Sequence, residues 1–552
     1  MMPKSINNDV TGKLLKVNQA NAFYNYVLGF DSANIDLLQT GSRFLKEGVS
    51  TSVFFSDFKC MYIDESGNKK IEVISRTGRD FDSNWKLEFS DEMPKSVATE
   101  LLHSCEIAFH ENRIQNEEVP YLRVCLPPIL LDNEEYQLPL FTSIKIYSDG
   151  IAILSFQLDA TWDGLDESHF LSDIVNMYNY YFKSIWIDSR LQKLDAKVVL
   201  NNAYEEKFSI GGKYLTNWKI KQLIKKSKQD TQKFLDEALK VEGHYFDFGD
   251  GGGNCTLHQI VGTENSESEE LTVDLCRSIY CNAISRLLVS EKNERKTSLG
   301  HFMWQGRPSI TLLRFEDQPE NKEELYKSFS HSISKILLRA NNVAKNPNLP
   351  PDLRVFDDFC LHGNRSILLW TWLKSENSSE NVWDDINTAS TIFGNQARTE
   401  LIEYYNLKVA RACTWAQNPR SNDHLLYAYK ILASSDSMIH QSSCSGEIVD
   451  SLSYLMEIFG TTGLINSGKE SARYHLDELR YNADKAKSRS DSSLALIFGL
   501  VGAASLAQFV VHPFVKETWP LLSEIQGPVV SFGMSGGGII LLATLIRLIN
   551  DR

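Results

Sequence analysis

Apolar and polar residues alternate along the first part of the chain in a pattern that predicts β-strands. The clearest strand pair covers Phe141–Leu158, where two apolar arms flank Asp149-Gly150, a pair that accepts the positive φ angles of a tight turn. A second pair is expected over Val53–Ile74. Further strands are expected at 309–315 and 366–373, and helices at 169–187, 216–240, 271–290 and 323–344. Strands interleaved with helices predict an α/β domain of one or two subdomains over residues 1–382.

After about residue 382 the periodicity becomes helical. Helices are expected at 384–416, 423–460 and 469–511, separated by Pro419 and by a break over 461–468. Charges of both signs alternate along the last of these helices, as is typical of a solvated helical face. The pattern therefore predicts a stalk of long helices over residues 383–491.

Two segments near the C-terminus contain no Asp, Glu, Lys or Arg: Ser492–Val515, of 24 residues, and Ile525–Ile546, of 22. A helix of about 20 residues crosses the roughly 30 Å hydrocarbon core of a bilayer. We therefore expect residues 492–552 to form a transmembrane hairpin with a short outer loop. The alternative is a buried helical hairpin in a large soluble core, although core helices rarely stay uncharged on every face over this length.

The flanking charges predict an orientation for this hairpin. Lys485, Lys487 and Arg489 precede the first segment, and Arg547 and Arg552 border or follow the second. By the positive-inside rule both termini then face the cytoplasm, in a multi-pass protein of the cell inner membrane. Nine scattered cysteines without a C-x-x-C motif agree with a reducing compartment.

The overall charge argues against one class of partner. The chain has 57 Lys and Arg against 71 Asp and Glu, a net charge of −14. Direct binding to nucleic acid is therefore not expected, because phosphate recognition needs a basic face. The apolar fraction of 42% is ordinary for a folded protein and excludes global disorder.

Small residues in both apolar segments predict close helix packing. On a helical wheel those of the first segment share one arc, and the second segment contains a G-x-x-x-G pair. A flexible joint is the alternative for the two glycines of that pair. The predicted packing residues are Ala495, Gly499, Gly502, Ala503, Gly533 and Gly537.

Polar residues on a separate arc of the first segment are candidates for lining a pore. Ser505, Gln508 and His512 lie together towards its outer end, and polar side chains in a membrane usually face water or a bundle interior. The alternative is that Gln508 makes one interhelical hydrogen bond while His512 reaches the interface.

Candidate ligand contacts lie on or beside the predicted strands after residue 300. Arg307, Arg314 and Arg365 could face an anionic ligand, and Trp370 could stack on a nucleotide base. Core aromatics and exposed arginines are the alternative interpretation.

Motifs of catalysis are missing from the sequence. The glycine-rich segment 247–254 has no G-K-[ST], and there is no H-E-x-x-H. The one match to G-x-S-x-G, at residues 533–537, lies inside the second uncharged segment and not between a predicted strand and a helix, where a nucleophile elbow is found. We therefore expect neither an enzyme nor a bound cofactor or metal. A hydrolase that uses a divalent metal between His244 and His258 remains a third hypothesis.

The layout of the chain resembles that of the CorA-type two-span cation channels. In these an α/β cytoplasmic domain leads through long helices into a pore-lining first span, an outer loop and a second span. The resemblance implies a ring of four or more copies in a lipid bilayer, with a divalent cation as the permeant ion. CorA-type proteins carry Gly-Met-Asn at the outer end of the first span, where this chain has Val511-His512-Pro513-Phe514.

Divergent CorA-like proteins also occur as membrane effectors of antiviral systems, including type III CRISPR systems that signal through small nucleotides. The resemblance therefore implies a homo-oligomeric ion channel that its cytoplasmic domain gates on binding a nucleotide. The competing hypothesis is a membrane-anchored sensor or scaffold whose hairpin serves only as an anchor.

Overall fold

The computed structural model describes most of the chain and divides it into two compact units, Met1–Lys469 and Glu470–Arg552. The described residues are 13–30, 32–77, 86–115, 119–133, 136–194, 209–210, 213–214, 243–247, 254–260, 271–290, 301–343, 348–356, 358–373, 386–419, 422–519 and 526–550, with single positions between 222 and 237. Each unit is considered by itself below.

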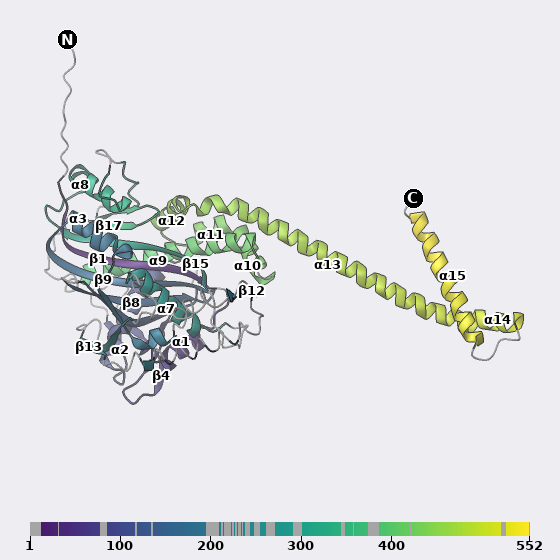
Figure 1. The fold of residues 1–552 in the computed structure, drawn as a ribbon. Helices are drawn as coiled ribbons and strands as arrows, with labels where there is room; N and C mark the ends of the chain where they lie inside the picture. Colours follow the sequence, from purple (N-terminus) through teal and green to yellow (C-terminus); the bar gives the residue numbers. More distant parts are fainter. Residues whose placement is uncertain are drawn as a thin grey trace, which may run out of the picture. The chain divides into compact units, whose positions relative to one another are not determined.

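The first unit is built on a 13-stranded sheet whose main path runs β13-β14-β10-β7-β8-β9-β1-β15-β17-β16 (Figure 1). β2 pairs with the first half of β7 and leads on to β3 and β4, while β10 pairs with the last residues of β7. All pairs are antiparallel except β15 with β17. The strands are β1 (Lys16–Phe30), β2 (Ser52–Phe55), β3 (Lys59–Ile63), β4 (Lys69–Val73), β7 (Tyr121–Asp132), β8 (Gln137–Tyr147), β9 (Ile151–Asp166), β10 (Ser184–Ile187), β13 (His244–Asp247), β14 (Asn254–Gln259), β15 (His301–Phe315), β16 (Phe359–Gly363) and β17 (Leu368–Trp372).

Two short strand pairs lie outside this sheet: β5 (Ser75–Thr77) with β6 (Lys86–Glu88), and β11 (Ser209–Ile210) with β12 (Lys213–Tyr214). Helices surround the large sheet (Figure 1). They are α1 (Leu37–Lys46), α2 (Lys95–Ile114), α3 (Glu167–His169), α4 (Ser189–Leu194), α7 (Val273–Leu287), α8 (Lys322–Leu338), α9 (Ile386–Gln417), α10 (Asn422–Ala433), α11 (Ser435–Gln441) and α12 (Gly446–Ile458), with a π-helical turn η1 (Phe170–Val175) and a 3-10 turn η2 (Met177–Asn179).

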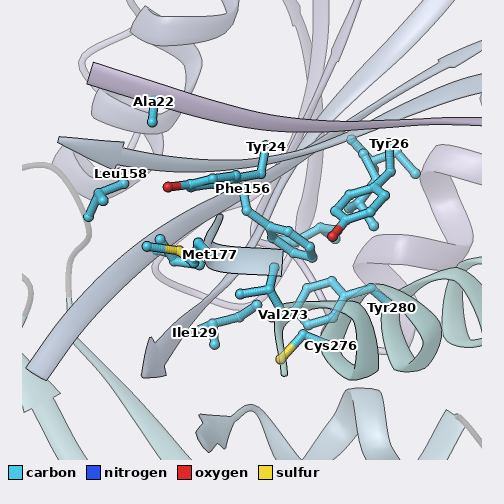
Figure 2. Packing of buried hydrophobic residues seen from close by; sticks show 14 of the residues in the cluster. Ala22, Tyr24, Tyr26, Ile129, Phe156, Leu158, Met177, Val273, Cys276 and Tyr280 are labelled. Atoms are coloured by element: carbon cyan, nitrogen blue, oxygen red, sulfur yellow. The ribbon is translucent and has the colours of Figure 1, made fainter. Parts of the chain in front are cut away.

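One face of the sheet is apolar and carries the main core. Successive side chains of a strand point to opposite faces, so Tyr24 and Tyr26 of β1 lie on the same side as Phe156 of β9. Helix α7 covers them with Tyr280 and Cys276 (Figure 2). The rings of Phe156 and Tyr280 meet edge to face at 5.5 Å between centroids. On the opposite face, under α9, buried polar side chains such as Asn25 and Ser155 lie beside a small apolar cluster that includes Phe23 and Leu313.

Several predicted elements agree with the structure. The turn at Asp149-Gly150 joins β8 to β9 as expected, with a φ of 84° at Gly150. The segment 53–74 folds as three strands rather than two, because β2 and β3 are already joined by a tight connection. The predicted helix 169–187 is wrong: the chain makes η1 and η2 and then enters β10, whose Ile185 and Ile187 are buried in the core.

The break expected over 461–468 lies elsewhere. α12 ends at Ile458, Gly460 adopts a φ of 78°, and α13 (Thr461–Leu506) starts at the next residue. Glycine tolerates this left-handed conformation without the steric cost that a Cβ adds. The single helix predicted over 423–460 is instead three helices, α10 to α12.

The second unit contains most of α13, the π-helical turn η5 (Ala507–Val511), α14 (His512–Thr518) and α15 (Gln526–Asn550). The predicted transmembrane hairpin is wrong: among the residues that the structure describes, no single helix is both long and apolar enough to cross a membrane. Only α12 together with residues 461–485, bent by 76°, passes by length and composition. The first uncharged segment is not one regular helix, because η5 interrupts it and α14 begins with a proline in its first turn.

Candidate functional site: a buried polar layer under helix α9

A row of polar side chains crosses the covered face of the sheet. Ser143 of β8 is opposite Ser155 of β9, which is opposite Asn25 of β1, and Asn25 is in turn opposite Arg307 of β15. Antiparallel pairing keeps directly opposed residues on the same face, so these side chains form one stripe under α9.

Helix α9 presents a matching polar stripe to the sheet. Gln396, Glu400, Glu403 and Arg411 are all at most 2% exposed, although three of the four are charged or chargeable. Their spacing of four, three and eight residues places them on one side of the helix. Charged side chains are almost never fully buried unless they are paired, so the partners of this stripe define the site.

Two acids and two bases form the centre of the layer. Glu400 accepts hydrogen bonds from both terminal nitrogens of Arg123 on β7, one of them at 3.0 Å. Lys145 on β8 donates to Glu111 on α2 and lies 3.4 Å from Glu400 Oε2. Tyr121 donates to the second oxygen of Glu111 at 2.6 Å. We call Glu111, Arg123, Lys145 and Glu400 the buried quartet.

The electrostatics of the quartet depend on its two cations. Burial by itself raises the pKa of Glu400, but Arg123 and Lys145 outweigh this effect and bring the pKa down from 4.5 to about 2. Burial, and then the neighbouring charge of Glu111, raise the pKa of Tyr121 well above 10. The quartet is therefore a closed, charge-balanced group, with Tyr121 as a neutral donor.

The quartet is tied to the centre of the sheet through Gln396. Its amide nitrogen lies 2.9 Å from Glu400 Oε1 and 3.1 Å from the Asn25 side-chain oxygen, to which Ser155 also donates at 2.6 Å. Such a network favours one register of α9 on the sheet, because a shift of the helix would leave buried donors and acceptors unpaired.

A second contact lies one turn further along α9. Arg307 of β15 forms an ion pair with Glu403, with 2.9 Å between Nε and Oε1. Its guanidinium lies 3.5 Å from the ring centre of Phe459, the residue that follows α12. Burial lowers the pKa of Arg307 and raises that of Glu403, while each partner opposes this shift in the other. This contact joins the sheet to α9 and to the connection between α12 and α13.

A third contact fastens the end of α9 to the β8–β9 turn. The Oδ2 atom of Asp149 accepts hydrogen bonds from Tyr404 at 3.0 Å and from Tyr427 of α10 at 3.1 Å. Arg411 lies 3.4 Å from the same oxygen and donates to the Tyr427 hydroxyl at 2.9 Å. The three contacts together fix α9 along its length.

The contacts of this layer hold elements of the first unit together. Within the described ranges there is no group of three His, Cys, Asp or Glu side chains that could hold a metal ion. The acids of the layer are paired with buried cations, so none of them is placed to take a proton from a substrate.

The predicted ligand residues occupy different environments. Arg307 and Trp370 are buried, and the Trp370 indole donates to Ser309 at 3.1 Å and packs edge to face on Phe359. Arg314 is half-buried and Arg365 is exposed. The structure therefore brings Arg307 close to Arg365, whose charge contributes to lowering the pKa of Arg307, but does not stack Trp370 on an open surface.

The predicted pore residues lie in the second unit. Ser505 and Gln508 are exposed, and His512 is half-buried, with Nδ1 3.5 Å from the Ser531 hydroxyl. A Cβ added at Gly502, Gly533 or Gly537 would meet open space within the single chain. The side chains of Ala495 and Ala503, and the surroundings of Gly499, lie outside the described residues. The roles predicted for all these residues stay predictions.

The hydrolase hypothesis rests on residues of one hairpin. β13 pairs with β14 so that His244 is opposite Leu257, next to His258. His244 is exposed and His258 is half-buried. The glycine-rich segment 248–253 between them lies outside the described residues, and the described part of the hairpin contributes to no metal-binding group.

Sequence reasoning missed the buried quartet. The available signal was a set of charged residues next to apolar ones: Lys145 lies between two isoleucines of a strand, and Glu400 and Glu403 flank Leu401-Ile402 in a helix. The pairing of Glu400 with Arg123, of Lys145 with Glu111 and of Glu403 with Arg307 depends on contacts between residues as much as 277 positions apart, which no local pattern contains.

Comparison of the chain with protein-family models, with curated proteins and with solved structures finds no match in any of the three. The resemblance to CorA-type channels therefore stays a prediction from the layout of the sequence. The function is argued below from the contacts of the chain itself.

Proposed function

We propose that the first unit is a regulatory module, without catalytic activity of its own, that controls the position of helix α13. The observation that carries the proposal is the contact of Arg307 with both Glu403 and Phe459. One side chain of the sheet thereby touches the helix that covers the sheet and the residue at which α12 gives way to α13. A change in the sheet or in α9 then reaches α13 through direct contacts.

The first turns of α13 are held by α9 as well. The Thr461 hydroxyl donates to the side-chain oxygen of Asn406 at 2.6 Å, and both residues are buried. A Cβ added at Gly468 would lie 3.1 Å from Leu432 and 3.2 Å from the sulfur of Cys413. This close approach supports an α13 start whose position depends on that of α9.

The buried quartet supports a two-state response. A layer of fully paired charges has a preferred arrangement, and intermediate positions of α9 would leave charges buried without partners. Packed interfaces of this kind change between discrete arrangements rather than deform continuously. A ligand controls such an equilibrium only if it binds one arrangement more tightly than the other.

An anionic small molecule, such as the nucleotide predicted from the sequence, is the proposed input. Arg365 is exposed in the turn before β17 and lies close enough to Arg307 to lower its pKa. Neutralising Arg365 would remove this repulsion and so favour the ion pair between Arg307 and Glu403. Ion conduction is not part of the proposal, because no helix that the structure describes is by itself long and apolar enough to cross a membrane.

Hydrogen exchange of the full-length chain tests the proposal. We expect a bound nucleotide to slow amide exchange around Arg365 and also to change exchange over the first turns of α13. The variant Phe459→Leu keeps an apolar residue at the junction but removes the ring under Arg307, so it should bind the nucleotide with α13 unchanged. The proposal would be contradicted if the nucleotide slowed exchange in the sheet but its effect on exchange in α13 was the same in wild type and in Phe459→Leu.

A further inference from the structure

Strand β4 lies at the end of one branch of the sheet. In the part of the chain that the structure describes, β4 pairs only with β3. Its side chains Ile71 and Val73 are 56% and 66% exposed. An edge strand with exposed apolar side chains is a ready template for pairing with another strand, which proteins normally block with charges, prolines or cover.

The backbone of β4 is in the right phase to accept a partner. The hydrogen bonds at the two ends of the β3–β4 ladder run from Asp64 N to Asn68 O and from Ile74 N to Phe58 O, each at 2.9 Å. In an antiparallel pair every second residue bonds to the partner strand. Even-numbered residues of β4 therefore bond to β3, whereas Lys69, Ile71 and Val73 direct their N–H and C=O groups to the free edge.

The sequence of β4 is complementary to itself. The strand reads Lys69-Lys70-Ile71-Glu72-Val73. If two copies pair antiparallel about Ile71, each Ile71 is opposite its counterpart and each Lys70 is opposite the Glu72 of the other copy. The lysine and glutamate occupy the pairs without mutual hydrogen bonds, where side chains of opposite strands come closest.

We propose that β4 is an interface between two copies of this chain, which joins their sheets across a two-fold axis. The pairing supplies roughly six backbone hydrogen bonds, two for each of the three outward-facing pairs. It also supplies two equivalent Lys70–Glu72 ion pairs, as an isologous contact requires. A five-residue strand is shorter than most stable interfaces, so the dimer is a weak one that forms at high protein concentration.

Existing contacts of these side chains are compatible with the pairing. Lys70 lies 3.1 Å from Glu92, with both side chains well exposed, and Glu72 accepts a hydrogen bond from Tyr62 at 2.7 Å. An ammonium group has three donors and a carboxylate has about four acceptor sites, so each can keep its internal partner while it binds the second copy.

A charge exchange tests the interface. In full-length protein, Lys70→Glu and Glu72→Lys each place like charges opposite one another, and either should raise the dimer dissociation constant at least about tenfold. The double variant K70E/E72K restores opposite charges and should dimerise within about threefold of wild type. The control E92Q removes the internal partner of Lys70 and should leave dimerisation unchanged. Sedimentation velocity over a range of protein concentrations measures the dimer dissociation constant of these four variants and of wild type.

Cross-linking provides a second, independent measurement. In a Cys444→Ser background, which removes the exposed native thiol, Ile71→Cys should form an intermolecular disulfide on mild oxidation, because residue 71 is opposite itself. Residue 69 is also exposed but lies opposite Val73 in the proposed pairing, so Lys69→Cys should not cross-link. The proposal would be overturned if the two cysteine variants cross-linked equally, or if the single charge reversals left the dimer dissociation constant unchanged. It would also be overturned if wild-type protein showed no dimer at any concentration tested.

Discussion

Replacing Glu400 by glutamine removes one negative charge from the buried quartet while it keeps the shape of the side chain. Arg123 and Lys145 would then face Glu111 alone, so a layer that is charge-balanced gains a net positive charge at full burial. Removing one partner of a buried ion pair typically costs about 3–5 kcal/mol, because the remaining charge stays buried and uncompensated.

The pKa of Glu400 expresses the same contacts as a dependence of stability on pH. Folding lowers this pKa from 4.5 to about 2, and a difference of about 2.5 corresponds to roughly 3 kcal/mol of stability. Because the folded-state pKa is the lower one, this stability is present above pH 4.5 and is lost as the pH falls towards 2. Glutamine does not titrate, so the variant should lack this part of the acid dependence.

Urea denaturation, followed by tryptophan fluorescence between pH 7 and pH 3, measures both effects. We expect E400Q to lower the free energy of unfolding by about 3–5 kcal/mol at pH 7. The difference in free energy of unfolding between wild type and E400Q should decrease as the pH falls towards 3. The control E316Q breaks an ion pair whose side chains are about half exposed, and it should cost less than about 1 kcal/mol. If E400Q is as stable as E316Q, or if its gap to wild type is the same at both pH values, the reasoning is refuted.

Three further outcomes follow from local contacts. Phe459→Leu should lower stability by only about 1–2 kcal/mol, because it removes one cation–π contact and keeps apolar packing, and thermal unfolding measures this loss. Gly150→Ala should destabilise far more than Gly67→Ala, although both glycines have positive φ, because a Cβ on residue 150 would lie 1.9 Å from the backbone oxygen of Ser32 whereas a Cβ on residue 67 would meet open space. N-ethylmaleimide should label Cys444 first, because it is exposed, whereas burial encloses Cys276 and raises its pKa; intact mass before and after denaturation checks the order.

The fold was predictable where one local pattern determined the structure. The β8–β9 hairpin was found because Asp149-Gly150 separates two alternating arms, and α7, α8 and α9 were found from helical periodicity. The segment 169–187 was predicted incorrectly because the same apolar spacing suits a helix and a buried strand. Burial of Ile185 and Ile187 against other strands decided between them, and that is a tertiary effect.

The candidate site was predictable only in part. Arg307 was identified as a ligand contact, but its partners in the structure are Glu403 and Phe459. The predicted membrane hairpin shows the same limit, because counting uncharged residues does not register the π-helical turn η5 and the new helix that starts at His512. Counts of charged residues and segment lengths describe only local sequence. They could not predict the register of α9 on the sheet, because this register depends on side chains that are distant in sequence.

The most direct test of the central claim compares two neighbouring residues of β8. Lys145 lies in the buried quartet, and Ile144 lies in the apolar core on the opposite face. Lys145→Met and Ile144→Ala should each cost a few kcal/mol, through an unpaired charge and a cavity respectively. Hydrogen exchange of the first turns of α13 is compared in the two full-length variants under native conditions.

If the polar layer couples the sheet to α13, exchange at Thr461–Gly468 should accelerate strongly in K145M and little in I144A at matched global stability. Equal acceleration in both variants would mean that α13 responds only to overall stability, and it would contradict the account.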